Sequence, residues 1–235
     1  MDHKDLTLTK EYLDKVQAML QGKRNCYPDT SELSDDLKFQ RVKDVAQRSM
    51  NGALVPLRDQ DVLAEEKSFE ETPAILAVRD FLKEPRECWC LVLAGPPGRG
   101  KSIAAAYWLK RIAYDIAVEN FETSNQPFTK QRWWSAQEVG RVSSHDQELT
   151  VLMQRDNIVI DDLGTEYLDK NGHILHRLDE LITRRYSNYK RTLITTNLNI
   201  QGFKNRYGNR IFSRIGDGGI FHGLVGESYR GGRDG

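Results

Sequence analysis

A short glycine-rich segment constrains the fold of this chain more than any other feature. It reads Gly95-Pro96-Pro97-Gly98-Arg99-Gly100-Lys101-Ser102 and has the spacing G-x-x-x-x-G-K-[S/T]. An apolar run over residues 88–94 precedes it, and a stretch of helical character over residues 101–119 follows it. In that context the glycines let backbone amides turn toward phosphate oxygens, and the helix directs its positive end at the same place. The sequence therefore predicts a phosphate loop, residues 95–102, between a buried strand and a helix.

Two side chains of the phosphate loop have separate predicted roles. Lys101 should reach the β- and γ-phosphates of a nucleotide, and Ser102 should ligate magnesium. Ile103, at the start of the helix, completes the set of expected nucleotide-binding residues. The alternative is a glycine-rich turn that binds nothing, which the flanking strand and helix disfavour.

An acidic pair follows another apolar run, about 60 residues after the phosphate loop. The run reads Ile158-Val159-Ile160-Asp161-Asp162. Because magnesium between the β- and γ-phosphates needs a carboxylate partner, Asp161 is the expected magnesium-associated acid. Asp162 is placed to accept a proton from the attacking water or to orient it, and Glu166 is the next candidate for that role. The alternative is a strand that ends in an aspartate turn.

A third apolar run, Thr192-Leu193-Ile194-Thr195-Thr196, ends in Asn197. In parallel sheets this end of a strand borders the ligand crevice. Asn197 could therefore hydrogen-bond the γ-phosphate or the attacking water. By itself, the Thr-Thr-Asn sequence is also typical of a turn that leaves a strand.

Apolar runs alternate with helical segments from residue 87 onward, which is typical of an α/β fold with a mostly parallel sheet. The expected strands are near residues 88–94, 131–135, 157–161 and 191–196, and the expected helices are near 101–119, 136–154 and 172–189. Upstream, apolar spacing predicts helices near 6–20, 34–50 and 73–83, with a connector over 51–70. We expect a helical N-terminal partner-binding region and linker over 1–70, an α/β domain over 71–230 and a disordered tail over 231–235.

Composition excludes several classes of protein. Hydrophobic residues make up 39% of the 235 residues and charged residues 29%, which is typical of a folded globular chain. The apolar runs are too short for a membrane span, the amino terminus has no apolar signal region, and three cysteines form no disulfide framework. We therefore expect a cytoplasmic protein with no membrane partner. Net charge is zero, but residues 184–235 carry 10 basic and 3 acidic residues, which indicates either an anionic partner or a surface that balances acids elsewhere.

Five segments together resemble the motifs of AAA+ ATPases of the DnaC/DnaI helicase-loader and IstB transposition-helper group. In order, they are Ile158 to Glu166, Leu181 to Tyr186, Thr192 to Leu198, Gly208 to Ile215, and Ser228-Tyr229-Arg230. The resemblance implies a P-loop NTPase (AAA+) three-layer sandwich over about residues 87–230, without a C-terminal helical lid. It also implies ATP and Mg²⁺ as cofactors, oligomer-dependent hydrolysis of ATP to ADP and phosphate, and an N-terminal arm that holds a hexameric replicative helicase.

In this group a neighbouring subunit inserts an arginine into the nucleotide site, which implies a homo-oligomer. By matching motif positions, Arg214 is the best candidate for that finger, Arg210 is the next, and Arg230 resembles a weaker second sensor. The alternative is that Arg206, Arg210 and Arg214 form one face of a short helix with surface ion pairs, which their four-residue spacing fits equally well.

The leading functional hypothesis is an ATP-dependent loader of a replicative helicase, with ATP hydrolysis as the switch. An IstB-like transposition helper, a small P-loop kinase and an ATP-gated scaffold that hardly hydrolyses ATP remain alternatives. Binding of single-stranded DNA is expected to be weak and ATP-dependent, because the monomer has no net charge. Arg132-Trp133-Trp134 could stack on bases, although aromatic residues in a strand are more often part of the core.

Overall fold

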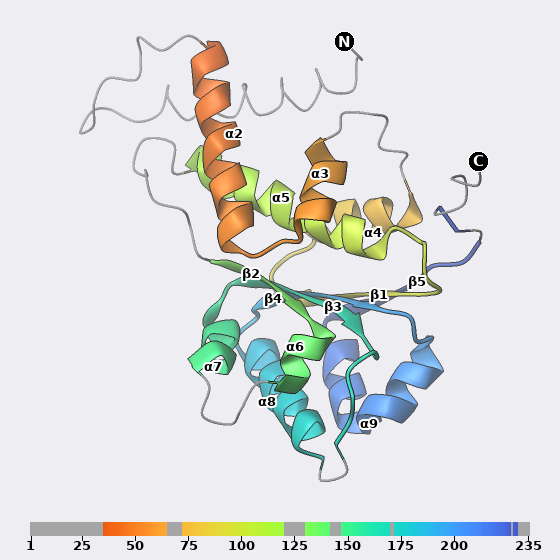
Figure 1. Ribbon diagram of the computed structural model, residues 1–235. Coiled ribbons are helices and arrows are strands. Elements are labelled where there is room, and N and C mark those ends of the chain that lie inside the picture. The colour runs from red at the N-terminus through yellow and green to blue at the C-terminus, as the bar shows by residue number, and fades with distance from the viewer. Residues whose placement is uncertain are drawn as a thin grey trace.

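The computed structural model describes residues 35–64, 72–119, 130–141, 147–169, 172–226 and 228–229 (Figure 1). The expected helix at 6–20, the tail at 231–235 and Arg230 lie outside these residues. Within the described ranges, no helix combines the length and apolar composition that a membrane crossing requires.

The centre of the fold is a five-stranded sheet in which every paired strand is parallel, in the order β2-β3-β4-β1-β5. The strands are β1 (Cys90–Ala94), β2 (Gln131–Ser135), β3 (Asn157–Leu163), β4 (Arg191–Thr196) and β5 (Gly219–Gly223). The mostly parallel sheet predicted from the sequence is confirmed. The predicted strands did not include β5, because two of its five residues are glycines and its apolar signal is weak. Pairing with β1 makes it a strand.

Helices cover both faces of this sheet and make a three-layer sandwich, as predicted (Figure 1). One face carries α2 (Asp35–Gly52), α3 (Leu57–Ala64), α4 (Pro73–Lys83) and α5 (Lys101–Glu119). The opposite face carries α6 (Ala136–Arg141), α7 (Gln147–Gln154), α8 (His173–Ser187) and α9 (Ile200–Gly216). Because successive side chains of a strand point to opposite faces, the sheet separates two hydrophobic clusters.

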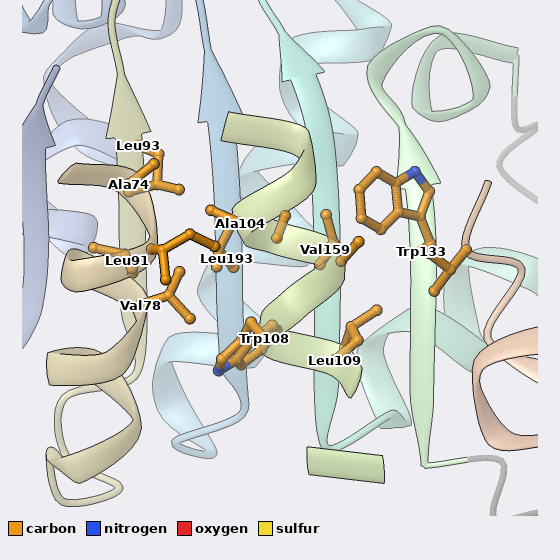
Figure 2. Packing of buried hydrophobic residues seen from close by; sticks show 14 of the residues in the cluster. Ala74, Val78, Leu91, Leu93, Ala104, Trp108, Leu109, Trp133, Val159 and Leu193 are labelled. Atoms are coloured by element: carbon orange, nitrogen blue, oxygen red, sulfur yellow. The ribbon is translucent and has the colours of Figure 1, made fainter. Parts of the chain in front are cut away.

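Figure 2 shows the cluster on the α4 and α5 face, where Leu91 and Leu93 of β1 lie beside Leu193 and Val159. Trp133 belongs to this cluster, whereas its neighbour Trp134 belongs to the cluster on the other face. Both indole rings are buried, with 4% and 1% exposure for the two residues. The core interpretation of the Arg132-Trp133-Trp134 segment is therefore confirmed, and these rings offer no stacking surface for bases.

The segment expected to be a connector, residues 51–70, contains α3 instead. Val55 and Leu63 are buried in the same hydrophobic cluster as residues of the sheet, and the backbone N–H of Trp133 donates to the Ala53 carbonyl at 2.7 Å. This contact covers the outer edge of β2. The charged Asp59-Gln60-Asp61 run hid the helix in the sequence, yet Gln60 is buried and its Nε2 donates to the Val55 carbonyl at 2.7 Å. The described part of the N-terminal region is therefore packed against the sheet layer.

Candidate nucleotide-binding site

The predicted site residues meet at the carboxyl ends of three neighbouring strands. The phosphate loop follows β1, the acidic pair ends β3, and Asn197 follows β4. The strand order places β4 between β3 and β1, so the three segments lie side by side. This is the edge at which ligands bind in parallel sheets.

The phosphate loop has a backbone conformation that its glycines make accessible. Gly95 and Gly98 have φ of +155° and +82°. A Cβ on Gly98 would lie 2.0 Å from the Ser228 Oγ, and one on Gly95 would lie 2.5 Å from the Leu224 carbonyl oxygen. These glycines therefore allow the segment after β5 to approach the loop, in addition to the role in phosphate binding that the motif predicts.

Lys101 connects the loop to β4. Its Nζ donates to the carbonyl oxygens of Gly95 and Pro96, at 2.7 and 2.8 Å, and to the Asn197 Oδ1 at 2.8 Å. These three acceptors are neutral oxygens, which hold the ammonium group in place without neutralising its charge. Lys101 and Asn197, 96 residues apart in sequence, are thus brought together as the site hypothesis expects.

Ser102 and Asp161 also meet. The Ser102 Oγ donates to the Asp161 Oδ1 at 3.0 Å, and the Thr195 Oγ1 donates to the same oxygen at 2.6 Å. Removal of the carboxyl from water is the main cause that raises the pKa of Asp161, the two hydroxyl hydrogen bonds lower it, and the neighbouring Asp162 raises it, so that the pKa is about 6. Thr195 was not predicted as a site residue.

The donor set of Ser102 and Asp161 fits a magnesium ion. Both offer oxygen, which Mg²⁺ prefers, and such ions commonly take one or two carboxylates together with waters and substrate phosphates. Among the described residues, no group of three or more His, Cys, Asp or Glu side chains could hold a metal. Waters and substrate phosphates would complete the coordination of a magnesium ion held by Ser102 and Asp161.

Asp162 lies in an irregular part of β3. The pairing with β4 shifts register between Ile160 and Leu163, and Asp162 has φ of +55°. Its backbone N–H donates to the Thr195 Oγ1 at 2.8 Å, and its carbonyl accepts from the Thr165 Oγ1 at 2.9 Å. The register shift is a bulge, which interrupts the regular alternation of the strand at the acidic pair.

Glu166, the next candidate for the water-handling role, is committed elsewhere. Its carboxylate accepts from the Gly164 N–H at 2.7 Å, from the Tyr207 hydroxyl at 2.7 Å and from the Arg206 Nε at 3.0 Å. The residue is buried, and its carboxylate pairs with Arg206 of α9. This geometry assigns Glu166 to the contact between the β3 loop and α9, and it disfavours a role as a base.

The candidate finger arginines pair with an acid of their own chain. The Arg214 Nη1 lies 2.5 Å from the Asp179 Oδ1, and the Arg210 Nε lies 3.2 Å from the Asp179 Oδ2. The Arg210 side chain is 70% exposed and that of Arg214 is 21% exposed. Gly208, with φ of +81°, interrupts α9, so Arg206 precedes the break and the other two arginines follow it. The three arginines thus form ion pairs, but they do not share one continuous helix.

Five of the ten basic residues within 184–235 form ion pairs with acids that precede them in the chain. The ion pairs are Arg184–Glu180, Lys190–Asp156, Arg206–Glu166, Arg210–Asp179 and Arg214–Asp179. Arg185 is completely buried. The interpretation of this excess as a balance for acids elsewhere therefore has direct support in the described residues.

Comparison with known proteins agrees with this arrangement. A family model described as IstB-like ATP binding protein matches residues 64–227. The crystal structure of DnaI is similar with a TM-score of 0.53 at 19% identity, over 72% of this chain and 89% of that chain. The crystal structure of the DnaC helicase loader has a TM-score of 0.49 at 22% identity, over 68% of this chain and 92% of that chain. A search of curated proteins found no match. The likeness to DnaI confirms the predicted P-loop fold.

Proposed function

We propose that this chain, which belongs to the family of IstB-like ATP-binding proteins, hydrolyses ATP. Hydrolysis acts as a switch that controls a partner protein on DNA. The observation that carries this proposal is the convergence of Lys101 with Asn197 and of Ser102 with Asp161 at one edge of the sheet. A turn that binds no ligand has no need for a cation and a hydroxyl after β1, a carboxylate on β3 and an amide after β4.

Each residue has a proposed part in the reaction. Lys101 binds the β- and γ-phosphates, and Ser102 and Asp161 hold Mg²⁺, which when bound neutralises charge that develops on the phosphates. Asp162 accepts a proton from the attacking water or orients it. Asn197, bonded to Lys101, is placed to respond to the γ-phosphate.

The arginine finger is proposed to come from a second copy of the chain. Arg214 is the first candidate and Arg210 is the second. Because both guanidinium groups share Asp179, either one can leave for a neighbouring subunit while the other keeps the carboxylate paired. An arginine finger contributes about 10³–10⁵ in rate.

Two variants test the nucleotide part of the proposal. Lys101→Ala should lose ATP binding while the protein stays folded, and Asp162→Asn should keep ATP binding and lose turnover, as measured by calorimetry and by phosphate release. Release of free phosphate in the wild type without a phosphorylated acceptor also distinguishes an ATPase from a small kinase. Unchanged ATP affinity in folded Lys101→Ala contradicts nucleotide binding in the phosphate loop.

Subunit mixing tests the finger. Arg214→Ala should bind ATP and hydrolyse it about 10³-fold or more slowly. Mixtures of Arg214→Ala with Asp162→Asn should regain activity, because a site with intact Asp162 can receive an intact Arg214 from its neighbour. Mixtures that assemble but stay inactive assign Arg214 to a role within its own subunit.

We propose a hexameric replicative helicase as the partner, bound through the N-terminal region within residues 1–70. The second candidate, which the resemblance to the IstB group implies, is a transposition helper that acts with a transposase. The full chain is the suitable reagent, because residues 46–63 share a hydrophobic cluster with the sheet. Co-sedimentation with purified helicase hexamer that depends on ATP supports the first candidate, and ATP-dependent binding to a transposase alone supports the second.

A further inference from the structure

We propose that the Arg99 side chain is a second cation for the phosphate chain of the nucleotide, acting beside Lys101. The phosphate-loop motif specifies two glycines, a lysine and a hydroxyl residue, and it leaves the position of Arg99 open. The inference rests on the proposed binding of nucleotide by this loop. It goes further because it gives a ligand-binding role to a side chain that the motif does not specify.

Arg99 is buried but has no partner for its charge among the described residues. The residue is 7% exposed, and its Nε has no hydrogen-bond acceptor within the described part of the chain. The ion pairs found among described residues also leave it out. Arg111, Arg155 and Arg191 likewise have an Nε without an acceptor there, but each of these residues is more exposed. Burial of a charge without a partner is unfavourable, so an acceptor from a ligand is expected.

The Arg99 guanidinium lies close to the segment that follows β5. A Cβ on Gly226 would lie 3.3 Å from the Arg99 Nη1, and Gly226 has φ of +111°. The segment that carries Gly226 is fixed to β1, because the Leu224 N–H donates to the Ala94 carbonyl at 2.7 Å. The guanidinium therefore lies where the loop meets the segment after β5.

Lys101 differs from Arg99 in this respect. Its ammonium group already donates to two loop carbonyls and to Asn197, whereas the Arg99 Nε lacks an acceptor within the described ranges. A guanidinium presents a planar fork of donors that matches two phosphate oxygens at once, and an ammonium acts as a point charge. The phosphate chain of a nucleotide supplies several anionic oxygens, and it is the anion that the loop is proposed to bind.

The experiment compares Arg99→Met with a matched control, Arg155→Met. Arg155 also has an Nε without a described acceptor, but it lies before the amino end of β3, whereas the phosphate loop follows the carboxyl end of β1. Affinities for ATP, ADP and inorganic tripolyphosphate are measured by calorimetry, and stability of the nucleotide-free protein by urea unfolding. Arg99→Met should weaken all three ligands by roughly 10–100-fold, as expected for lost hydrogen bonds to a charged group. Its nucleotide-free unfolding midpoint should equal or exceed that of the wild type, and Arg155→Met should keep wild-type affinities.

Several outcomes decide the matter. Wild-type affinity in Arg99→Met, together with a lower unfolding midpoint, assigns Arg99 to structure and overturns the inference. If Arg99→Met does not fold, Arg99→Lys decides, because it keeps the charge and loses the fork: weaker ATP binding supports the inference and unchanged binding overturns it. If the wild type does not bind ATP, the proposed function itself is contradicted. That result is obtained from the wild type alone and is therefore distinct from a failure of the Arg99 inference.

Discussion

Two buried arginines, one at the amino ends of the strands and one at their carboxyl ends, differ in the hydrogen-bond acceptors that the chain provides for them. At the amino ends of β3 and β4, Arg185 has acceptors for all of its guanidinium nitrogens. They are the Thr192 Oγ1 and the carbonyl oxygens of Leu152, Arg155, Asp156 and Arg191, at 2.7–3.4 Å. At the carboxyl edge, the Arg99 Nε has no acceptor among the described residues. The hydrogen bonds of Arg185 are thus complete within the chain, whereas for Arg99 we propose that the nucleotide supplies the acceptor.

Arg185 also shows how a charge is held by dipoles instead of by a carboxylate. Its partners are backbone carbonyls and one hydroxyl, and they include carbonyls at the C-terminal end of α7. Burial lowers the pKa of Arg185 to about 9, well above neutrality, so the group remains a cation. Arg185 of α8 therefore links α7 and β4 at the amino ends of the strands, away from the candidate nucleotide site at their carboxyl ends.

The largest expected effect is the loss of Arg185. Arg185→Met should lower the free energy of unfolding by about 3 kcal/mol or more, because several buried acceptors lose their donor together. Urea unfolding measures the change. The free energy of unfolding of Arg185→Lys, which has fewer donors in a different geometry, should lie between those of the wild type and Arg185→Met. An unfolding midpoint equal to that of the wild type in Arg185→Met would mean that water replaces the guanidinium and that the Arg185 hydrogen bonds do not stabilise the fold.

The next effect concerns Asp161 and pH at the nucleotide edge. Its folded pKa of about 6 lies above the ordinary value of 3.8, so the folded chain retains a proton that the unfolded chain releases between these values. This acid therefore makes stability fall as pH rises from about 4 to about 6, by up to about 3 kcal/mol. Asp161→Asn should match the wild type near pH 4 and exceed it at pH 7, in metal-free urea unfolding with a chelator. Equal stability at pH 7 would contradict the unfavourable burial of this carboxylate.

A smaller effect is expected for Asp179, whose carboxylate holds two arginines of α9. Asp179→Asn should lower the free energy of unfolding by about 1–2 kcal/mol, because both partly exposed ion pairs are lost. The difference from the wild type should shrink in 1 M salt, where exposed charges are screened. The Arg185→Met difference should persist there, since its partners are buried dipoles. If the effect of Asp179→Asn does not depend on salt, the Asp179 ion pairs behave like the buried hydrogen bonds of Arg185, and the expected difference between them is wrong.

The smallest effect belongs to Arg184, next to Arg185 in sequence. Its side chain is 63% exposed and lies 3.8 Å from Glu180. Arg184→Met should therefore change the free energy of unfolding by no more than about 0.5 kcal/mol. The same unfolding assay thus contrasts two adjacent arginines, and a loss near that of Arg185→Met would show that neighbouring exposed charge, not buried hydrogen bonding, stabilises this edge.

The candidate site illustrates which residues a sequence can bring to attention. The phosphate loop, Asp161 and Asn197 were predicted as site residues because each follows an apolar strand pattern, and the structure brings them together. Thr195 was missed, although its hydroxyl contacts Asp161 and accepts from the Asp162 N–H. A β-branched residue inside a strand gives the same pattern whether its hydroxyl faces a core or a site. The bulge at Asp162, which creates that contact, has no sequence signal of its own.

The sequence by itself determined the parallel sheet, the loop between β1 and α5, and the acid and amide at the neighbouring strand ends. These features depend on periodicity and spacing within about ten residues, and local backbone physics decides them. Tertiary structure decided the rest. It packed one face of α3 against the core, gave Asp179 two arginines from α9, and left Arg99 buried without a described partner while Arg185 received five acceptors. Each of these depends on groups far apart along the chain, whose meeting is fixed only when the layers pack and water is excluded.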